Sequence, residues 1–578
     1  METGSVDYHP LVEEDPYHFL KANPYVFLQN FYWYYEMKGF ENIFMAYIFR
    51  FILAEFILSF TFTLGYCISW RDVINEKTNK LLTYPTKNVA TAWCILSIIL
   101  AIVLIMIGIR FLKTAFQFKN YCANVLHVHT RELASMPWGV FLTKLTRDKF
   151  SSIEKSQLTS LDFVKVLMRR ENYLIALFNK KILNLSVPYF PKFQFVTHVF
   201  GWCFALSFDV FNDQGEVKGE YLDPQNHERL VAQLKSNFYR TGLIALIFSP
   251  IVLIVLILYG IFSLAERIQN TPDFLGSRNW TPHARWEFRD FDEVLCLFTQ
   301  RLAKSFVPAS KYINQFQIHA LNNLGRLLVF LLALIAAPLI LLTLVRRSII
   351  DCYIGDRSVV WVLSILGTSL AILRSLLPEE HFVFEPHEFM EEVIMHIHHL
   401  PLEWVEKAHT PEVHKTFVSY FQFKVVIFLV EVLSVIITPL LFIYSLPLCA
   451  EETIQFLRDM TIEEPGLGRM VCFARLNMDD TYPPAQEHYI SQPDRHKLVD
   501  TQKMQMSIIN FKANYPNWEP TSASSKLFLD TIVASDPGKL ENCHFTSNHS
   551  VWDKMNKSYI SQSTKKFDKK VFYNVEYP

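Results

Sequence analysis

An uncharged run of 21 residues, VATAWCILSIILAIVLIMIGI at positions 89–109, constrains this chain more than any other feature. As an α-helix it would extend ~31 Å, which matches the hydrocarbon core of a bilayer. The composition agrees, because 51% of the residues are hydrophobic and only 19% are charged, whereas soluble domains carry about 25% charged residues. The chain is therefore predicted to be an integral membrane protein.

Five further apolar segments accompany this run, and three of them contain an internal proline, Pro250, Pro338 or Pro439; the segments with Pro250 and Pro439 are the two that could dip into the membrane and return. Pro250 and Pro439 each remove a backbone hydrogen bond and can bend a helix. Hydropathy leaves open whether these two segments cross the membrane as kinked helices or dip in and return. The further segments cover residues 43–70, 241–265, 327–345, 358–373 and 421–450.

Basic residues in the loops bear on orientation, because Lys and Arg favour the cytosolic side. Residues 266–326 carry eight of them, which favours a re-entrant third segment and a cytosolic loop. Arg346, Arg347 and Arg357 would then face away from the cytosol, which argues the other way. In the re-entrant version no glycan is expected on Asn279 of the sequon NWT, because only luminal sequons are used.

Ionisable residues inside apolar segments are candidates for a polar path, because charge in hydrocarbon is costly and usually faces a cavity. Glu55 lies in the first segment, and Lys424 and Glu431 share a helix face in the last one. This face could line a groove for lipid headgroups. Alternatively, Lys424 could reach the interface while Glu431 meets a structural partner. Further candidates near segment ends are Asn322, Asn323, Arg326 and Arg374.

The stretch HFVFEPHEFMEEVIMHIHH, residues 381–399, holds five of the 19 histidines. It lacks the second His of a metalloprotease HExxH motif. On a helix, His396 and His399 would share a face while His398 would point away, which suits a metal site poorly. The better interpretation is an amphipathic helix that starts at Pro386. Its buried face would consist of Met390, Val393, Ile394 and Ile397.

Signatures of catalysis are missing from the sequence. GxSxG, Walker and GxGxxG motifs do not occur, and GLG at Gly466–Gly468 is predicted to be a turn. A net charge of -1 argues against nucleic-acid binding. Nine cysteines without CxxC pairs argue against a zinc finger or a disulfide scaffold. We therefore expect no catalytic residue, metal or cofactor, and a protein that is not an enzyme.

Several blocks, in order along the chain, resemble the autophagy-related protein 9 family. One block is FSLAERIQNTPDFLGSRNWTPHARWEFRDFDEVLCLFTQRL followed by PASKYINQF, at residues 262–316. Another is PEEHFVFEPHEFMEEVIMHIHHLPLEW at 378–404, and a third is NYPNWEP at 514–520. Several blocks in the same order are more specific than one short motif.

The resemblance implies an all-α integral membrane protein with four transmembrane helices, two re-entrant segments and a helical cytosolic core, assembled as a domain-swapped homotrimer. The two transmembrane pairs would occupy 43–112 (43–70 and 89–112) and 325–373 (325–345 and 357–373). The re-entrant segments would be 241–265 and 425–450, around Pro250 and Pro439. The cytosolic regions would be 1–42, 113–240, 266–324, 374–424 and 451–578.

The function that the resemblance implies is ATP-independent scrambling of phospholipids between membrane leaflets during autophagosome growth. Implied partners are phospholipids, further copies of the chain, the lipid-transfer protein autophagy-related protein 2 and the autophagy initiation kinase complex. The implied location is the autophagosome membrane and its precursor structure, with Golgi- and endosome-derived vesicles, and both termini in the cytosol. The alternatives are a non-transporting scaffold that recruits autophagy machinery, and an ion channel or transporter.

Overall fold

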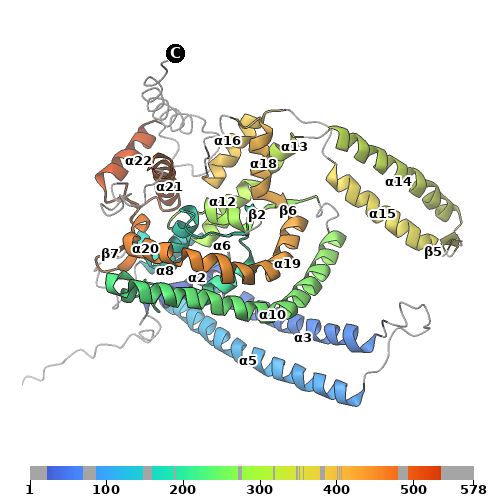
Figure 1. Ribbon diagram of the computed structural model, residues 1–578, viewed down its shortest axis with the longest axis horizontal. Helices are drawn as coiled ribbons and strands as arrows, with labels where there is room; N and C mark the ends of the chain where they lie inside the picture. Colours follow the sequence, from blue (N-terminus) through green and yellow to red (C-terminus); the bar gives the residue numbers. More distant parts are fainter. Residues whose placement is uncertain are drawn as a thin grey trace, which may run out of the picture.

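The computed structural model describes most of residues 23–535, and this part of the chain is predominantly helical (Figure 1). The predicted N-terminal segment as far as residue 22 and the tail beyond 535 lie outside the described residues. Within 23–535, the residues not described are 69, 71–85, 147–158, 188–189, 271–275, 317–318, 347–348, 351, 356, 378–383, 400, 402–403, 405–406 and 479–492.

A first helical hairpin consists of α3 (Phe40–Phe62), which continues as a π-helical turn (Thr63–Cys67), and α5 (Lys87–Asn124). The two helices approach closely where the Tyr47 ring lies over Gly108, and the Tyr47 hydroxyl donates to the Leu104 carbonyl oxygen. Helix α5 extends to Asn124, well beyond residue 112, where the expected transmembrane segment ended. The last turns of α5 enter the protein body and bury Ala115, Phe118, Tyr121 and Cys122.

A second hairpin pairs α14 (His319–Val345) with α15 (Val359–Leu376) through the short strands β4 (Tyr353–Ile354) and β5 (Arg357–Ser358). It projects from the body in Figure 1. No residue in the most apolar 18-residue window of Asn322–Val345 is buried. Within one chain, this hairpin therefore packs mainly on itself.

Two bent helical segments run side by side through the middle of the molecule (Figure 1). One is α10 (His227–Asn270), a continuous helix that contains Pro250. The other is α19 (Lys424–Leu440), which contains Pro439 and continues through a π turn (Leu441–Ser445) and a 3-10 turn (Leu446–Cys449) into α20 (Ala450–Met460). Both proline-containing segments thus stay helical and bend.

Glycines in α10 let the two bent segments approach closely, as small residues do between membrane helices. A methyl group at Gly242 would lie 2.8 Å from Ile443 and 3.1 Å from the Pro439 carbonyl oxygen. At Gly260 it would run into the Phe428 ring.

The body contains two hydrophobic cores. The first surrounds α8 (Ser160–Asn179), whose N-terminus is closed by a capping box between Thr159 and Asp162. The second is built around α16 (Pro386–Ile397) and includes Trp280 of β3 (Arg278–Trp280). Strand β3 pairs antiparallel with β6 (Phe421–Phe423), which leads directly into α19. The second core is thus tied to a bent membrane segment.

The other elements of the body complete these cores. In the first core or beside it are α2 (Pro24–Glu36), α6 (Thr130–Ser135), α7 (Trp138–Leu145), β1 (Ser186–Val187), β2 (Phe190–Gln194), α9 (His198–Ser207), 3-10 turns at Gly219–Leu222, Pro224–Asn226 and Cys472–Arg475, β7 (Thr461–Glu464), β8 (Gly468–Val471), α21 (Pro493–Asn514) and α22 (Ala523–Ser535). In the second core are α11 (Pro282–Phe288), α12 (Leu295–Lys304), α13 (Phe306–Asn314) and α18 (Pro411–Tyr420).

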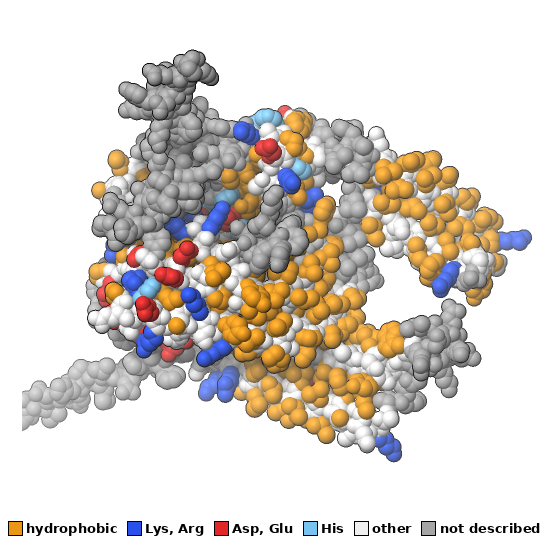
Figure 2. Space-filling view, in the orientation of Figure 1, with side chains coloured by type: hydrophobic (Ala, Val, Ile, Leu, Met, Phe, Trp, Pro, Cys, Tyr) orange, Lys and Arg blue, Asp and Glu red, His pale blue; other side chains and the backbone are white. Residues whose placement is uncertain are grey.

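Five helices among the described residues are long and apolar enough to cross a membrane, and the apolar helix Val359–Arg374 is shorter. Figure 2 shows hydrophobic side chains gathered over both hairpins and the bent segments, while charged side chains gather near α20 and the start of α10. The predicted turn at Gly466–Gly468 is confirmed, because β7 and β8 form an antiparallel hairpin around it.

The contact at Gly260 yields a first prediction. Alanine normally stabilises a helix relative to glycine, but in Gly260→Ala the added methyl group meets the Phe428 ring, and overpacking costs about 1–3 kcal/mol. We expect Gly260→Ala to lower the apparent unfolding temperature of the detergent-purified protein. Gly367→Ala is the matched control, because a methyl group there meets no atom within 4 Å. Equal behaviour of the two variants would contradict the packing of α10 on α19.

Candidate lipid path and the body that supports it

Glu431 of α19 lies at the N-terminus of the short helix α9. The backbone N–H groups of His198 and Val199 donate to its carboxylate oxygens at 3.3 and 3.2 Å. A carboxylate at this end of a helix satisfies unpaired N–H groups and is stabilised by the helix dipole. Glu431 thus has a structural partner, as one of the two interpretations from the sequence required, and its place in a lipid path stays a prediction.

Lys424 is the first residue of α19 and is half-buried. Its backbone N–H donates to the Ser277 carbonyl oxygen at 3.0 Å, beside the β3–β6 ladder. Glu431 follows two helical turns later, about 10 Å along the helix axis. The two side chains are therefore anchored at different heights along one bent segment.

Glu55 lies half-buried between the helices of the first hairpin. Its Oε2 accepts a hydrogen bond from the Ser97 hydroxyl of α5 at 2.7 Å. One turn beyond Glu55, the Phe60 ring meets Phe262 of α10 edge-on, with 4.9 Å between ring centroids. The first hairpin thus contacts the bent helix α10 on the C-terminal side of Pro250.

The other predicted lipid-path residues lie together at the base of the second hairpin. Asn322, Asn323 and Arg326 occupy the first turns of α14, and Arg374 lies in the last turn of α15. This base is separated from the α10–α19 pair in Figure 1. Within one chain, the predicted residues therefore form three groups, at Glu55, at the start of α19 and at this hairpin base, and do not ring one cavity.

The histidine-rich stretch is amphipathic as predicted, but its end differs. Met390, Val393, Ile394 and Ile397 are buried, and Pro386 opens α16. The helix ends at Ile397, and His398 follows in the left-handed conformation with φ 54°. The prediction that His396 and His399 share a helical face is therefore wrong, because His399 lies beyond the helix. Residues 381–383 of the stretch lie outside the described residues.

His398 belongs to a buried ionic cluster that the sequence analysis missed, which we call the ionic node: Asp290, Glu293, Arg301, His398 and Asn510. Nδ1 of His398 lies 2.5 Å from Asp290 Oδ2. Arg301 donates to both Glu293 carboxylate oxygens at 2.8 and 2.6 Å. Asn510 of α21 donates to both acids. The node thus joins the α11–α12 connection, the end of α16 and α21.

Burial and neighbouring charges shift pKa values in and around the node. Burial would raise the pKa of Asp290, but the positive charges of His398 and Arg301 outweigh it and lower that pKa. Burial lowers the pKa of His399 to about 4, so this ring is neutral at pH 7. Burial also lowers the pKa of Lys503 to about 8, although nearby acids oppose the shift. The node is a set of paired charges, which is typical of a structural role.

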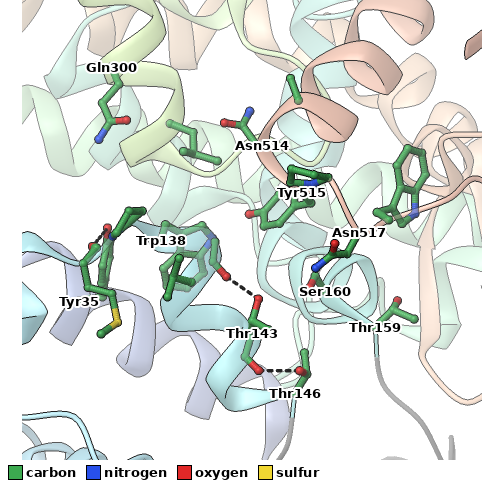
Figure 3. A pocket seen from close by; sticks show the side chains of 18 of the residues that line it. Tyr35, Trp138, Thr143, Thr146, Thr159, Ser160, Gln300, Asn514, Tyr515 and Asn517 are labelled. Atoms are coloured by element: carbon green, nitrogen blue, oxygen red, sulfur yellow. Dashed lines mark hydrogen bonds between the residues drawn. The ribbon is translucent and has the colours of Figure 1, made fainter. Parts of the chain in front are cut away.

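The described residues contain no group of three or more His, Cys, Asp or Glu side chains that could hold a metal ion. They do contain a cavity of about 900 Å³ between α2, α7, α12 and the NYPNWEP segment (Figure 3). Hydroxyls in its wall are engaged with the backbone: Thr143 donates to Gly139 at 2.8 Å, and Thr146 donates to Thr143 at 2.7 Å. The wall is mainly neutral and mixes polar and apolar side chains, with the aromatic residues Tyr35, Trp138, Tyr515 and Trp518 among them. No local sequence pattern marks this cavity, because its wall comes from distant parts of the chain.

Comparison with known proteins identifies the family. A family model described as autophagy protein ATG9 matches residues 22–477, well over half of the chain. The chain belongs to the ATG9 family of autophagy proteins. The resemblance seen in the sequence is therefore confirmed.

Individual ATG9 relatives agree with this assignment. Autophagy-related protein 9 of Dictyostelium discoideum is 30% identical over 535 residues, which cover 89% of this chain and 75% of the relative. The protein of the same name from Cryptococcus neoformans is 28% identical, with 88% of this chain and 62% of the relative covered. The cryo-EM structure of Schizosaccharomyces pombe Atg9 matches 79% of this chain and 98% of its own, with a TM-score of 0.61 at 25% identity.

The ionic node yields a second prediction. Arg301→Ala should lower the stability of this ATG9-family protein by about 3–5 kcal/mol, because Asp290 and Glu293 lose a buried partner. Arg229→Ala removes the exposed ion pair with Glu220 and should cost about 0–1 kcal/mol. Thermal unfolding of both purified variants measures the difference. Equal stabilities would show that the node does not support the fold.

Proposed function

We propose that this protein is an ATP-independent phospholipid scramblase of autophagy vesicles and the growing autophagosome membrane. The observation that carries the proposal is that two bent segments, α10 with Pro250 and α19–α20 with Pro439, pack side by side. The barrier to lipid flipping is the cost of bringing a polar headgroup into hydrocarbon. Bent, short membrane segments thin the bilayer locally, and polar groups of the bent segments would hydrate the shortened path.

The predicted polar residues supply such groups. Glu431 and Lys424 lie on α19, and Glu55 lies on the helix that contacts α10. The second hairpin would contribute to the mouth of the same path only if the hairpin of one copy reached the bent segments of another. Its residues at that mouth would be Asn322, Asn323, Arg326 and Arg374. Its exposure within a single chain supports this arrangement, and with it a domain-swapped homotrimer.

The proposed topology has four crossing helices, in the two hairpins, and two re-entrant segments, in α10 and α19. Both termini and the two cores would then be cytosolic. Partners would be autophagy-related protein 2, which delivers lipid to one leaflet, and the initiation kinase complex. Scrambling needs no chemical step, so the protein would not be an enzyme and would need no cofactor.

A third prediction tests scrambling directly. The purified protein is placed in sealed liposomes that hold a fluorescent phospholipid, and an impermeant quencher is added without ATP or calcium. We expect quenching well beyond the outer-leaflet half of the signal. Lys424→Leu combined with Glu431→Gln removes both charges and keeps an oxygen to cap α9. It should slow scrambling by roughly tenfold, equal to ~1.4 kcal/mol in the barrier.

The other outcomes separate the alternatives. Quenching that stops at half, with intact oligomers, would refute scrambling and favour a scaffold whose cytosolic surfaces recruit partners. Ion flux without lipid movement would favour a channel or transporter.

A fourth prediction tests the topology at Asn279. This residue begins the sequon NWT in β3, opposite Gln422 of β6, and its side chain accepts from the Trp280 N–H at 2.8 Å. If α10 is re-entrant, β3 stays in the cytosol and remains unglycosylated. Treatment with a glycosidase should leave the gel mobility of the cell-expressed protein unchanged. A shift that Asn279→Gln abolishes would mean that α10 crosses the membrane.

A further inference from the structure

The helix α9 is apolar on every side. Its sequence, HVFGWCFALS, carries no acidic or basic residue other than His198. One face packs on the bent segments, because Phe200 meets Phe442 and Phe204 meets Phe238, with ring centroids 5.6 and 6.3 Å apart. A helix that is hydrophobic all round needs cover on its remaining sides.

The opposite face of α9 is uncovered in the single chain. Trp202 is 72% exposed and Leu206 is 79% exposed, and residues four apart project from the same side of a helix. Ten residues of helix are about 15 Å long, half of the ~30 Å needed to cross a bilayer. Helix α9 is therefore too short to cross a bilayer, and its exposed face must be covered in another way.

The position of α9 indicates what covers it. Its N-terminus is held by Glu431, about 10 Å along α19 from Lys424. Its inner face rests on α10 and α19, whose outer surfaces are strongly apolar (Figure 2). On α10 these surfaces include Ile247, which is 72% exposed. The uncovered face of α9 thus belongs to a helix that is packed directly on the two apolar bent segments.

The chemistry of that face fits the boundary between headgroups and acyl chains. Tryptophan is enriched at this depth because its ring is amphipathic. Helix α9 has no charged face, but its inner side is already packed on protein, so only its outer aromatic and aliphatic side would need to enter the bilayer. A polar protein partner would find no charged group on α9 to pair with.

We propose that α9 is an interfacial helix, with Trp202 and Leu206 inserted into one leaflet of a phospholipid bilayer. Glu431 is its positioning residue, because it fixes the N-terminus of α9 to the bent segment α19. The region between α5 and α10, predicted as entirely cytosolic, thereby makes a membrane contact of its own. This inference requires membrane insertion of the bent segments but not scrambling.

Site-specific photocrosslinking tests the proposal. The photoreactive residue p-benzoylphenylalanine replaces Trp202, Leu206 or, as a control, Leu527 of α22, which is 69% exposed on the body. Each full-length protein, shown to elute as the wild type, is irradiated in phosphatidylcholine liposomes and analysed by mass spectrometry. We expect phospholipid adducts at 202 and 206 and none at 527. Crosslinks to a second copy, or no adduct at 202 and 206, would overturn the proposal.

The role of Glu431 is tested by hydrogen exchange in the same liposomes. Glu431→Leu removes both oxygens that accept from α9, so the amides of His198 and Val199 should exchange several-fold faster and lipid adducts at 202 should decrease. Glu431→Gln keeps one accepting oxygen and should restore most of both signals. Unchanged exchange and adducts in Glu431→Leu, or a failure of Glu431→Gln to restore them, would overturn the positioning role.

Discussion

A lipid bilayer offers the peptide backbone no hydrogen-bonding partner, and the membrane part of this protein depends on that constraint. The long apolar segments are helical wherever the structure describes them. The two segments that contain Pro250 and Pro439 bend but remain helical (Figure 1). Close packing at Gly242 and Gly260 holds α10 against the α19 segment. Each of the two bent segments is therefore supported by the other.

Several charged side chains in the body join distant parts of the chain. Arg301 donates to the His396 carbonyl oxygen at 2.7 Å, Arg289 pairs with Glu171, and the Arg278 guanidinium lies 3.8 Å from the centre of the Phe423 ring. These three arginines belong to the basic loop that favoured a cytosolic orientation. Because each has a structural partner, their number is a weaker signal of topology than the positive-inside rule assumes.

Local patterns predicted the membrane class, the apolar segments, the buried face of α16 and the turn at Gly466–Gly468, since length and periodicity within about 20 residues encode them. They failed where contacts are long-range. Glu431 caps a helix 233 residues earlier in the chain, and Asn510 completes an acid cluster 220 residues away. The left-handed exit of α16 at His398 was also missed, because it falls on a histidine and not on the Gly or Asn that usually marks such a helix end. Of the candidate site, the sequence could name polar residues but not the partners that decide their roles.

The residues of the ionic node lie far apart in the chain, so the node can form only late in synthesis. Asp290 and Glu293 emerge from the ribosome long before Asn510, and all the apolar helices described lie between the start of the chain and that residue. The second hairpin can form on its own, since α14 and α15 are nearly adjacent in the chain. The body cannot close until α21 has been made. A chain arrested before α21 would therefore carry inserted helices and an open, acid-lined body, the kind of intermediate on which chaperones and quality control act.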